Sequence, residues 1–315
     1  MKKKIIYVSG VLNFETIVDV DSFPIFYCPV EYPFFGINST VGGQAYNIAK
    51  ALTTLGGNKV ILGGEVGNDL LGKVVIDEIN KLGIDASSVD TKLEQTPTSA
   101  IFVDRDCNTK IYNDLKDLQD VKKDVKKEIK NLKASDLVVL SNTNFNREIL
   151  LKAKELGKKV ASDVHIVGST DDEFNQDFMK YSDILFLSKK GLNNYKYEDF
   201  LLEIYNKYHN EIIVLGEGRE GAMVLIAKEK VIYHIDAITL RTIVNTVGSR
   251  DALFSAFLHY YLRRRNPLKA LELAEVFTSI KIGEMGGSNG FVNAKVVNKQ
   301  FKDVDFDVYK IKQFQ

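Results

Sequence analysis

Residues 137–161 of the chain read LVVLSNTNFNREILLKAKELGKKVA. The apolar run at residues 137–140 has the length and composition of a buried strand. Residues 148–156 then carry apolar side chains at helical spacing, and a second strand-like run follows at residues 159–161. A strand, a helix and a further strand in this order are typical of a βαβ unit with two parallel strands. The stretch therefore favours an α/β fold.

The same alternation continues along most of the chain. Further apolar runs lie at residues 5–8, 60–62, 184–187 and 212–215, and another amphipathic stretch lies at residues 46–55. Successive βαβ units predict three layers, α/β/α, with a mostly parallel central sheet covered by helices. Ligands bind such sheets at the carboxyl ends of the strands.

Two regions depart from this pattern. Residues 12–40 are rich in aromatic residues and proline, and residues 96–113 contain two strand-like runs, 99–103 and 110–112. We predict that both regions are β-excursions from the main sheet and together form a small β-sheet lid. A single domain over residues 1–315 is expected, and because exposed strand edges can pair with a second chain, a homodimer through the lid is expected as well.

The composition is that of an ordinary globular protein. Of 315 residues, 42 are Lys or Arg and 42 are Asp or Glu, so a net charge of zero favours neither nucleic acid nor a membrane surface as a partner. No apolar stretch approaches the ~20 residues that span a bilayer. Two cysteines make no disulfide framework and four histidines have no metal-ligand spacing, so a reduced, cytoplasmic protein without a zinc or iron site is expected.

Lysine is concentrated in residues 121–132. Because the apolar residues there fall at helical spacing, the lysines are expected on the opposite face of a helix. A solvated helix face is therefore predicted rather than a nucleic-acid interface. The apolar positions are Val121, Val125, Ile129 and Leu132.

Residues 216–221 read GEGREG and follow a strand-like run. The spacing G-x-G-x-x-G is that of a dinucleotide-binding turn, but such a turn must open a helix. A strand-like run, AMVLIA, follows Gly221 instead, so we reject a nicotinamide-dependent oxidoreductase. A glycine-rich hairpin is expected, over which a nucleotide can lie because glycine allows close approach to the backbone.

Two other glycine turns precede helices. Residues 245–251 read NTVGSRD before the helical ALFSAFL, and residues 42–47 read GGQAYN. A helix N-terminus presents free backbone N–H groups at the positive end of its dipole, which suits a transferring phosphate. Asp251 can take a proton from an attacking hydroxyl, or it only stabilises the helix start. Asn47 can bind a polyol, or its turn is only a helix cap.

Together these motifs resemble the ribokinase family, also called the phosphofructokinase-B (PfkB) carbohydrate kinases, from about residue 5 to about residue 292. The Gly-Gly turn with Asn47 is similar to the family's early motif, and the glycine-rich residues 55–72 continue that pattern. Residues 97–100, PTSA, resemble the family's lid strand. Residues 245–251 are similar to its late D-T-x-G-A-G-D motif, with departures.

The resemblance implies a ribokinase-like fold and ATP-dependent phosphorylation of a hydroxyl on a sugar, a sugar-like molecule or a nucleoside, with Mg²⁺ bridging the phosphates. It implies that Asp251 is the general base. The backbone N–H groups implied as the anion hole belong to Gly248, Ser249, Arg250 and Asp251. The residues implied for substrate are Asn13, Glu15, Gly42, Gly43 and Asn47, and those implied for the nucleotide are Gly218 and Gly221.

The chain departs from the family pattern at three places. Asn245 stands where an Asp in several members helps to form a monovalent-cation site, so that site is expected to be weak here. Arg250 replaces a glycine, and the backbone donors survive this change only if φ is negative. After residues 184–187 the family's N-x-x-E, which organises magnesium and phosphate, is replaced by SKKG.

These departures leave a second function open, namely a catalytically weak relative that binds a sugar or nucleoside. Arg250 also has two interpretations. Its side chain points to solvent without a function, or it adds positive charge to the phosphate site through its planar guanidinium. The substrate is left open between a sugar and a base, and the lid residues expected to decide it are Phe14, Phe35, Ile101 and Tyr112.

Overall fold

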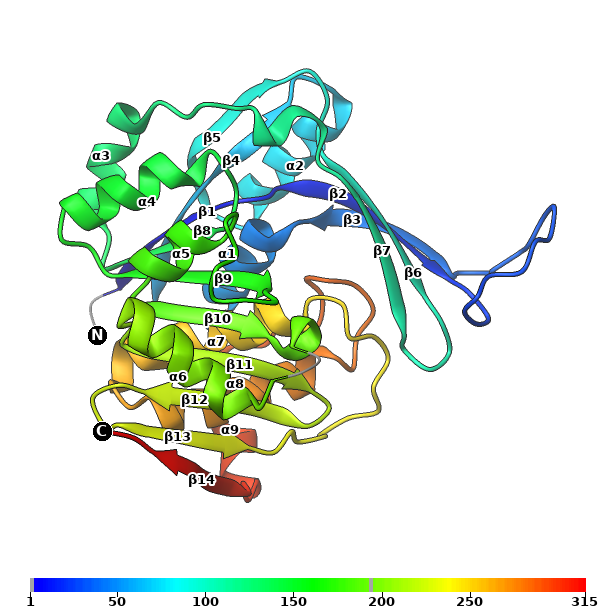
Figure 1. The fold of residues 1–315 in the computed structure, drawn as a ribbon. Coiled ribbons are helices and arrows are strands. Elements are labelled where there is room, and N and C mark those ends of the chain that lie inside the picture. The colour runs from blue at the N-terminus through cyan, green and yellow to red at the C-terminus, as the bar shows by residue number, and fades with distance from the viewer. Residues whose placement is uncertain (1–2, 193–194) are drawn as a thin grey trace.

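The structure, a computed structural model, describes residues 3–192 and 195–315 and has a large central sheet (Figure 1). The strands of this sheet are Lys4–Ser9 (β1), Asn58–Gly67 (β4), Asp85–Leu93 (β5), Leu137–Ser141 (β8), Val160–Ile166 (β9), Ile184–Ser188 (β10), Ile212–Gly218 (β11), Gly221–Ile226 (β12), Val231–Ile235 (β13) and Val308–Gln313 (β14). Their order is β14-β13-β12-β11-β10-β9-β8-β1-β4-β5. Pairing is parallel from β5 across to β11 and antiparallel from β11 to β14.

Helices cover both faces of the sheet, which confirms the predicted three layers. One face packs against Gln44–Leu55 (α1), Leu70–Lys81 (α2), Ser249–Arg264 (α7), Pro267–Lys281 (α8) and Ala294–Gln300 (α9). The other packs against Val125–Ala134 (α3), Asn146–Glu155 (α4), Gln176–Tyr181 (α5) and Tyr197–Tyr208 (α6). Short 3₁₀ turns lie at Lys116–Gln119, Lys189–Gly191 and Phe301–Asp303. No helix within the described ranges is long and apolar enough to cross a membrane.

The central strands bury side chains on both faces. In β1, Ile6 and Val8 pack into the core on the α1 and α7 side, whereas Tyr7 packs into the core on the α3 and α4 side. Because helices exclude water from both faces, such a strand is a continuous apolar run rather than an alternating one. This is why the runs were recognisable in the sequence.

A second, smaller sheet stands apart from the first (Figure 1). Its strands are Asn13–Asp19 (β2), Ile37–Gly42 (β3), Thr98–Val103 (β6) and Thr109–Asp114 (β7), in the order β3-β2-β6-β7. The two segments expected to leave the main sheet therefore pair with each other, through the parallel ladder of β2 and β6. Ile17 and Ile101 pack against Val247 and Met285, next to the start of α7. That this sheet closes over a ligand stays a prediction.

The connection between β2 and β3, residues 20–36, projects away from the rest of the molecule (Figure 1). We call it the aromatic loop. Phe35 is 100% exposed in this loop, and its expected role in deciding the substrate stays a prediction. Its other exposed aromatic residues are Phe26, Tyr27, Tyr32 and Phe34.

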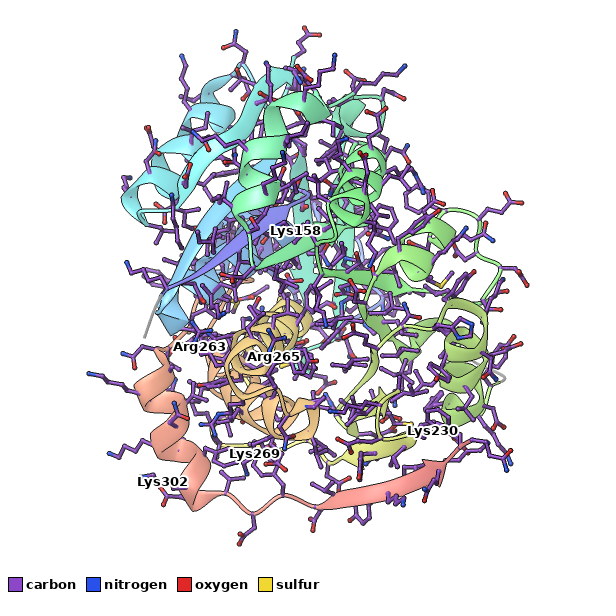
Figure 2. The ribbon with its side chains drawn as sticks, turned by 90° about the vertical axis from the view of Figure 1, so that its left-hand side faces the viewer. Lys158, Lys230, Arg263, Arg265, Lys269 and Lys302 are labelled. Atoms are coloured by element: carbon purple, nitrogen blue, oxygen red, sulfur yellow. The ribbon has the colours of Figure 1, made fainter. Side chains whose placement is uncertain are left out.

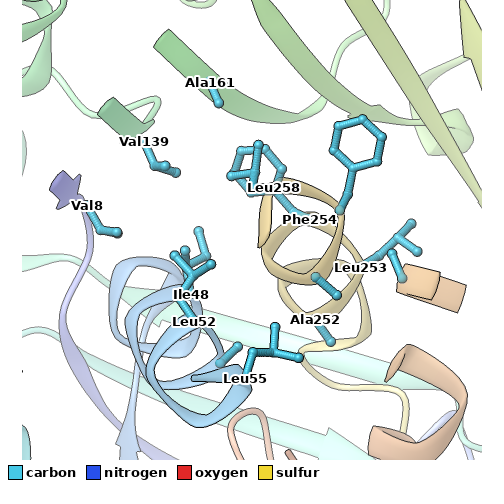
Figure 3. Packing of buried hydrophobic residues seen from close by; sticks show 14 of the residues in the cluster. Val8, Ile48, Leu52, Leu55, Val139, Ala161, Ala252, Leu253, Phe254 and Leu258 are labelled. Atoms are coloured by element: carbon cyan, nitrogen blue, oxygen red, sulfur yellow. The ribbon is translucent and has the colours of Figure 1, made fainter. Parts of the chain in front are cut away.

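Helices α1 and α7 pack side by side beneath the sheet (Figure 3). Ile48 and Leu52 on α1 share a buried cluster with Ala252 at the start of α7. At the other end of α7, Arg263 donates to the carbonyl of Gly57 and to the amide oxygen of Asn58, each at 2.8 Å (Figure 2). Helix α7 is thus fixed along its length, with its first turn at the carboxyl edge of the parallel strands.

The lysine-rich stretch differs from its prediction at Lys123. Helix α3 begins only at Val125, and the side chain of Lys123, before it, is 1% exposed. Its ammonium lies 3.3 Å from carboxylate oxygens of both Glu65 and Asp90 and donates to the Ser88 carbonyl at 2.8 Å. Helical spacing carries no information about such a long-range ion pair. Lys123 therefore neutralises buried acid rather than lying on a solvated face.

Replacement of Lys123 by methionine is expected to lower the free energy of unfolding by about 1–3 kcal/mol, because the buried Glu65 carboxylate then keeps only the more exposed Lys92, at 3.8 Å, as a counter-charge. Urea unfolding at pH 7 measures the change. Lys122→Met is the control, since Lys122 is exposed and its loss should have little effect. Equal unfolding midpoints for the two variants would contradict this account of Lys123.

Candidate active site

Asp251 lies in the first turn of α7 and is 8% exposed. Its Oδ2 accepts a hydrogen bond of 2.8 Å from Nδ2 of Asn47, which lies near the start of α1 and 204 positions earlier in the chain. Burial raises the pKa of the Asp251 carboxyl to about 6, although the Asn47 hydrogen bond and the Arg250 charge oppose this shift. A carboxyl with a pKa near neutrality is suited to general-base chemistry.

Glu15 brings a second buried carboxyl to the same place from β2. Its Oε1 accepts a hydrogen bond of 3.1 Å from the backbone N–H of Gly43. Burial raises the pKa of Glu15 to about 7, and the charge of Asp251 acts in the same direction. A side chain at Gly42 would overlap the Glu15 carboxyl, and Gly43 has φ +92° with the Val11 carbonyl only 2.5 Å from where a Cβ would stand. Both glycines are thus required by close packing.

Asn13 connects this cluster to the small sheet. It pairs with Gly42 across β2 and β3, and its Nδ2 donates to Oγ of Ser99 at 2.5 Å. Ser99 in turn donates to Oδ1 of Asn113 at 2.7 Å. All five residues predicted to contact substrate, including Asn47, are therefore brought together beside Asp251.

Three buried oxygen atoms of this cluster have no hydrogen-bond partner among the described residues. They are Oδ1 of Asn13, Oε2 of Glu15 and Oδ1 of Asn47. Buried polar atoms are nearly always paired in folded proteins, so an unpaired set asks for an explanation. Hydroxyl groups of a bound ligand would supply the missing donors.

The start of α7 has the features expected of an anion hole. Gly248 caps the helix with φ +74°, and a side chain there would overlap the carbonyl of Gly287. Arg250 lies within the helix and is not among the residues with positive φ, so the condition for replacing glycine is met. The N–H of Ser249 is already used, since it donates to the Thr246 carbonyl at 3.1 Å. In the described residues, the N–H groups of Gly248, Arg250 and Asp251 meet no protein acceptor.

Arg250 does not point freely into solvent. Its Nε lies 2.8 Å from Oδ2 of Asp163, a fully buried carboxylate in the middle of β9 and level with the last residue of β8, and the Arg250 side chain is 29% exposed. Burial raises the pKa of Asp163, and the Arg250 charge opposes that shift. The guanidinium therefore neutralises a buried acid beside the start of α7. Asp163 was missed in the sequence, where an acid two residues after an apolar run was its only signal.

The turn between β11 and β12 is a hairpin, as predicted, and the strand after Gly221 is confirmed. A side chain at Gly221 would overlap the carbonyl of Ile235, so packing against β13 explains this glycine. Gly218 has φ +70° and faces open space, which leaves its backbone accessible. Glu217, the residue before Gly218 in β11, is buried, and burial raises its pKa to about 7. Nucleotide binding at Gly218 and Gly221 stays a prediction.

Lys281, the last residue of α8, is a further member of the site that was missed in the sequence. It is fully buried, and its ammonium donates to the carbonyls of Val247 and Gly286 on either side of the α7 start. A signal was present, because Lys281 falls seven residues after Ala274 and four after Phe277, on the apolar face of α8.

The residues present do not fit the monovalent cation that the resemblance implies in several members. Asn245 offers no carboxylate, and its Oδ1 accepts from the N–H of Val247 at 2.6 Å while its Nδ2 contacts Sδ of Met285 at 3.1 Å. The neighbouring carbonyls of Val247 and Gly286 are taken by Lys281.

The described residues show no cluster of metal ligands. Within residues 3–192 and 195–315, no three His, Cys, Asp or Glu side chains gather at metal-binding distance. Asp163 is paired with Arg250, and lysines stand in the Lys189–Gly191 turn. The binding of Mg²⁺ together with ATP phosphates stays a prediction.

Comparison with known proteins gives consistent matches. Residues 8–294 match the pfkB family carbohydrate kinases. The chain is 27% identical over 300 residues to a 5-dehydro-2-deoxygluconokinase of Clostridium botulinum (strain Alaska E43), covering 84% of each protein. It is 26% identical over 272 residues to a ribokinase of Lactococcus lactis, covering 85% of this chain and 88% of that one.

Solved structures share the fold over nearly the whole chain. A microbiome-derived acarbose kinase superposes with a TM-score of 0.84 and 21% identity, covering 96% of this chain and 100% of that one. A ribokinase of Giardia lamblia superposes with a TM-score of 0.82 and 16% identity, covering 96% and 99%.

Arg250→Gly is expected to lower the free energy of unfolding by about 1–3 kcal/mol, because Asp163 then remains buried without a counter-charge. Asp163→Asn added to the same chain should recover much of that loss, since the amide carries no charge. Urea unfolding at pH 7 of the two single variants, the double variant and the wild type gives the coupling between the residues. A single Arg250→Gly variant as stable as the wild type would show that Arg250 is a neutral substitution.

Proposed function

The chain belongs to the pfkB family of carbohydrate kinases, and on this premise we propose that it transfers the γ-phosphoryl group of MgATP to a hydroxyl of a sugar or sugar-like molecule, nucleosides included. One observation carries the proposal. Three unpaired buried oxygens lie on Asn13, Glu15 and Asn47, and Asn47 also donates to the carboxyl of Asp251. Each unpaired atom costs about 1–3 kcal/mol, and a polyhydroxylated ligand removes that cost by donating to them.

In the proposed reaction, Asp251 acts as the general base. Its Oδ2 is engaged by Asn47, which leaves Oδ1 for the attacking hydroxyl. The hydroxyl oxygen forms a bond to the γ-phosphorus while the bond from that phosphorus to the β,γ-bridging oxygen breaks, and the hydroxyl proton passes to Asp251. ADP then leaves with the bridging oxygen.

The free N–H groups at the start of α7 are the proposed site for the transferring phosphoryl group. A helix N-terminus stabilises negative charge through its dipole and its unpaired donors. Donors already fixed in position need no rearrangement as charge develops in the transition state, which is why they accelerate the reaction. The Gly218 turn, open above its backbone, is the proposed contact for the nucleotide.

A second candidate function is a relative that binds a sugar or nucleoside with little turnover. It is favoured by the Lys189–Gly191 turn, which carries lysines where the family has N-x-x-E, and by the ion pair of Lys189 with Glu220. The two functions share the ligand site and differ in catalysis. Turnover of ATP with one sugar or nucleoside decides between them.

We also propose that the protein forms a homodimer through the small sheet. Strands β3 and β7 are its edges and have free backbone groups on one side, which a second copy can pair. Ile37 on β3 and Tyr112 on β7 are more than half exposed, and the aromatic loop adds Tyr27 at 92%. Apolar groups gathered in this way are typical of protein interfaces.

Asp251→Asn is expected to lower kcat by about 10²–10⁴-fold while KM changes little, because the amide keeps the shape of the side chain but cannot accept the proton. In the wild type, kcat should rise with pH through about 6, since the raised pKa of Asp251 leaves it protonated and inactive below that value. ADP release is measured with the substrate found by screening sugars and nucleosides. Near-normal kcat in Asp251→Asn would rule out this residue as the base.

Light scattering is expected to give twice the chain mass of 35.4 kDa for the wild type. The double substitution Tyr27→Ser with Phe34→Ser should weaken the dimer because it removes two exposed rings from the aromatic loop. The control is Leu151→Ser on α4, an exposed apolar residue outside the small sheet. A monomeric wild type, or a control as disruptive as the double variant, would contradict the proposed interface.

A further inference from the structure

We propose that the ammonium of Lys281 is a built-in cation for the phosphate site at the start of α7, and that it replaces any monovalent cation there. The inference rests on the proposed function for its catalytic part. The replacement of an external cation is inferred from the contacts of Lys281 and does not depend on the proposed function.

The ammonium joins the two loops that flank the first turn of α7. One acceptor is the carbonyl of Val247, next to the cap residue Gly248, and the other is the carbonyl of Gly286 at 2.7 Å. Gly286 precedes Gly287, whose carbonyl packs so closely on Gly248 that no side chain fits between them. A positive charge therefore lies directly behind the proposed anion hole.

Stability alone is a poor explanation for this lysine. It is fully buried, and in the described residues no carboxylate lies within ion-pair distance of its nitrogen. Burying an ammonium is unfavourable unless its surroundings compensate, and an apolar side chain of similar size is often as stable or more so. Burial lowers the pKa of Lys281 to about 8, and the negative charges of Asp251 and Glu15 oppose that shift. The group is therefore predominantly charged at pH 7.

The same contacts exclude a monovalent cation. Backbone carbonyl oxygens are the ligands that replace the hydration shell of K⁺ in proteins, and here Lys281 already occupies those of Val247 and Gly286. The amide of Asn245 is engaged by Val247 and Met285, so it is not free to bind a cation beside Lys281.

Two effects on the chemistry follow. The charge of Lys281 lowers the pKa of Asp251 and so favours its ionised, proton-accepting form. It also adds to the helix dipole where the γ-phosphoryl group is proposed to bind, so it should strengthen binding of the triphosphate. Lys281 acts through these groups and is thus a positioning residue rather than one that touches the reacting atoms.

The first test uses thermal unfolding without ATP, in KCl and in tetramethylammonium chloride at equal ionic strength. The wild-type Tm is expected to be the same in both salts. Lys281→Ala leaves space beside the carbonyls of Val247 and Gly286, where K⁺ can bind. KCl should therefore raise the Tm of this variant by about 2 °C or more. Lys281→Met is the matched control, because it also lacks the charge but fills the space and should not respond to K⁺.

The second test measures MgATP affinity for the same three chains in both salts. The wild type should bind equally in both, and Lys281→Met should bind about tenfold more weakly in both. Lys281→Ala should bind weakly in tetramethylammonium chloride and recover in KCl, which a purely structural lysine would not cause. Where Lys281→Ala fails to fold, Lys281→Met and the wild type still decide the proposal.

The proposal is overturned by a wild-type Tm or MgATP affinity that rises with K⁺. A folded Lys281→Ala that ignores K⁺ overturns it too, as does a Lys281→Met chain with wild-type MgATP affinity. Failure of the proposed function looks different, since no chain would then bind MgATP. The salt dependence of Tm would still test the cation replacement in that case.

Discussion

The packing of α1 against α7 is the interaction on which the candidate site depends. The apolar faces of these two helices are buried together beneath the sheet, and this brings Asn47 at the start of one helix onto Asp251 at the start of the other. Arg263 fixes the far end of α7 to the turn before β4. A shift of either helix along the other would break the Asn47–Asp251 hydrogen bond and move the free N–H groups away from Asn13 and Glu15.

The charges around this contact are balanced within the protein. Asp163 is paired with Arg250. Lys281 lies next to the start of α7, and its positive charge interacts with the carboxyls of Asp251 and Glu15. Each of these carboxyls has a raised pKa because it is buried, and each has a cation near enough to oppose the shift. Arg250, which differs from the family pattern, is thus part of one electrostatic arrangement with Lys281, in which both supply positive charge near the start of α7.

Much of the fold could be predicted because its signals are local. Buried strands were readable as apolar runs, and glycine turns such as that at Gly43 marked the helix starts. The pattern of an acid in the first turn of a helix made Asp251 a candidate, and the family resemblance implied its role as the base, which stays a prediction. The roles of Lys123, Asp163 and Lys281 could not be predicted from the sequence. Lys123 and Asp163 each depend on a partner distant in the sequence, and Lys281 depends on two backbone carbonyls. A lysine or aspartate is expected to be exposed from its residue type alone. The tertiary structure shows that these three side chains are buried.

The central claim is that the start of α7 beside Asp251 is where phosphoryl transfer takes place. A crystal structure with a non-hydrolysable ATP analogue and Mg²⁺ tests it most directly. The account predicts the γ-phosphate oxygens about 3 Å from the backbone nitrogens of Gly248 and Arg250, with the γ-phosphorus facing the space beside the Asp251 carboxyl. A triphosphate bound elsewhere on the molecule, or directed away from α7 into solvent, would contradict it.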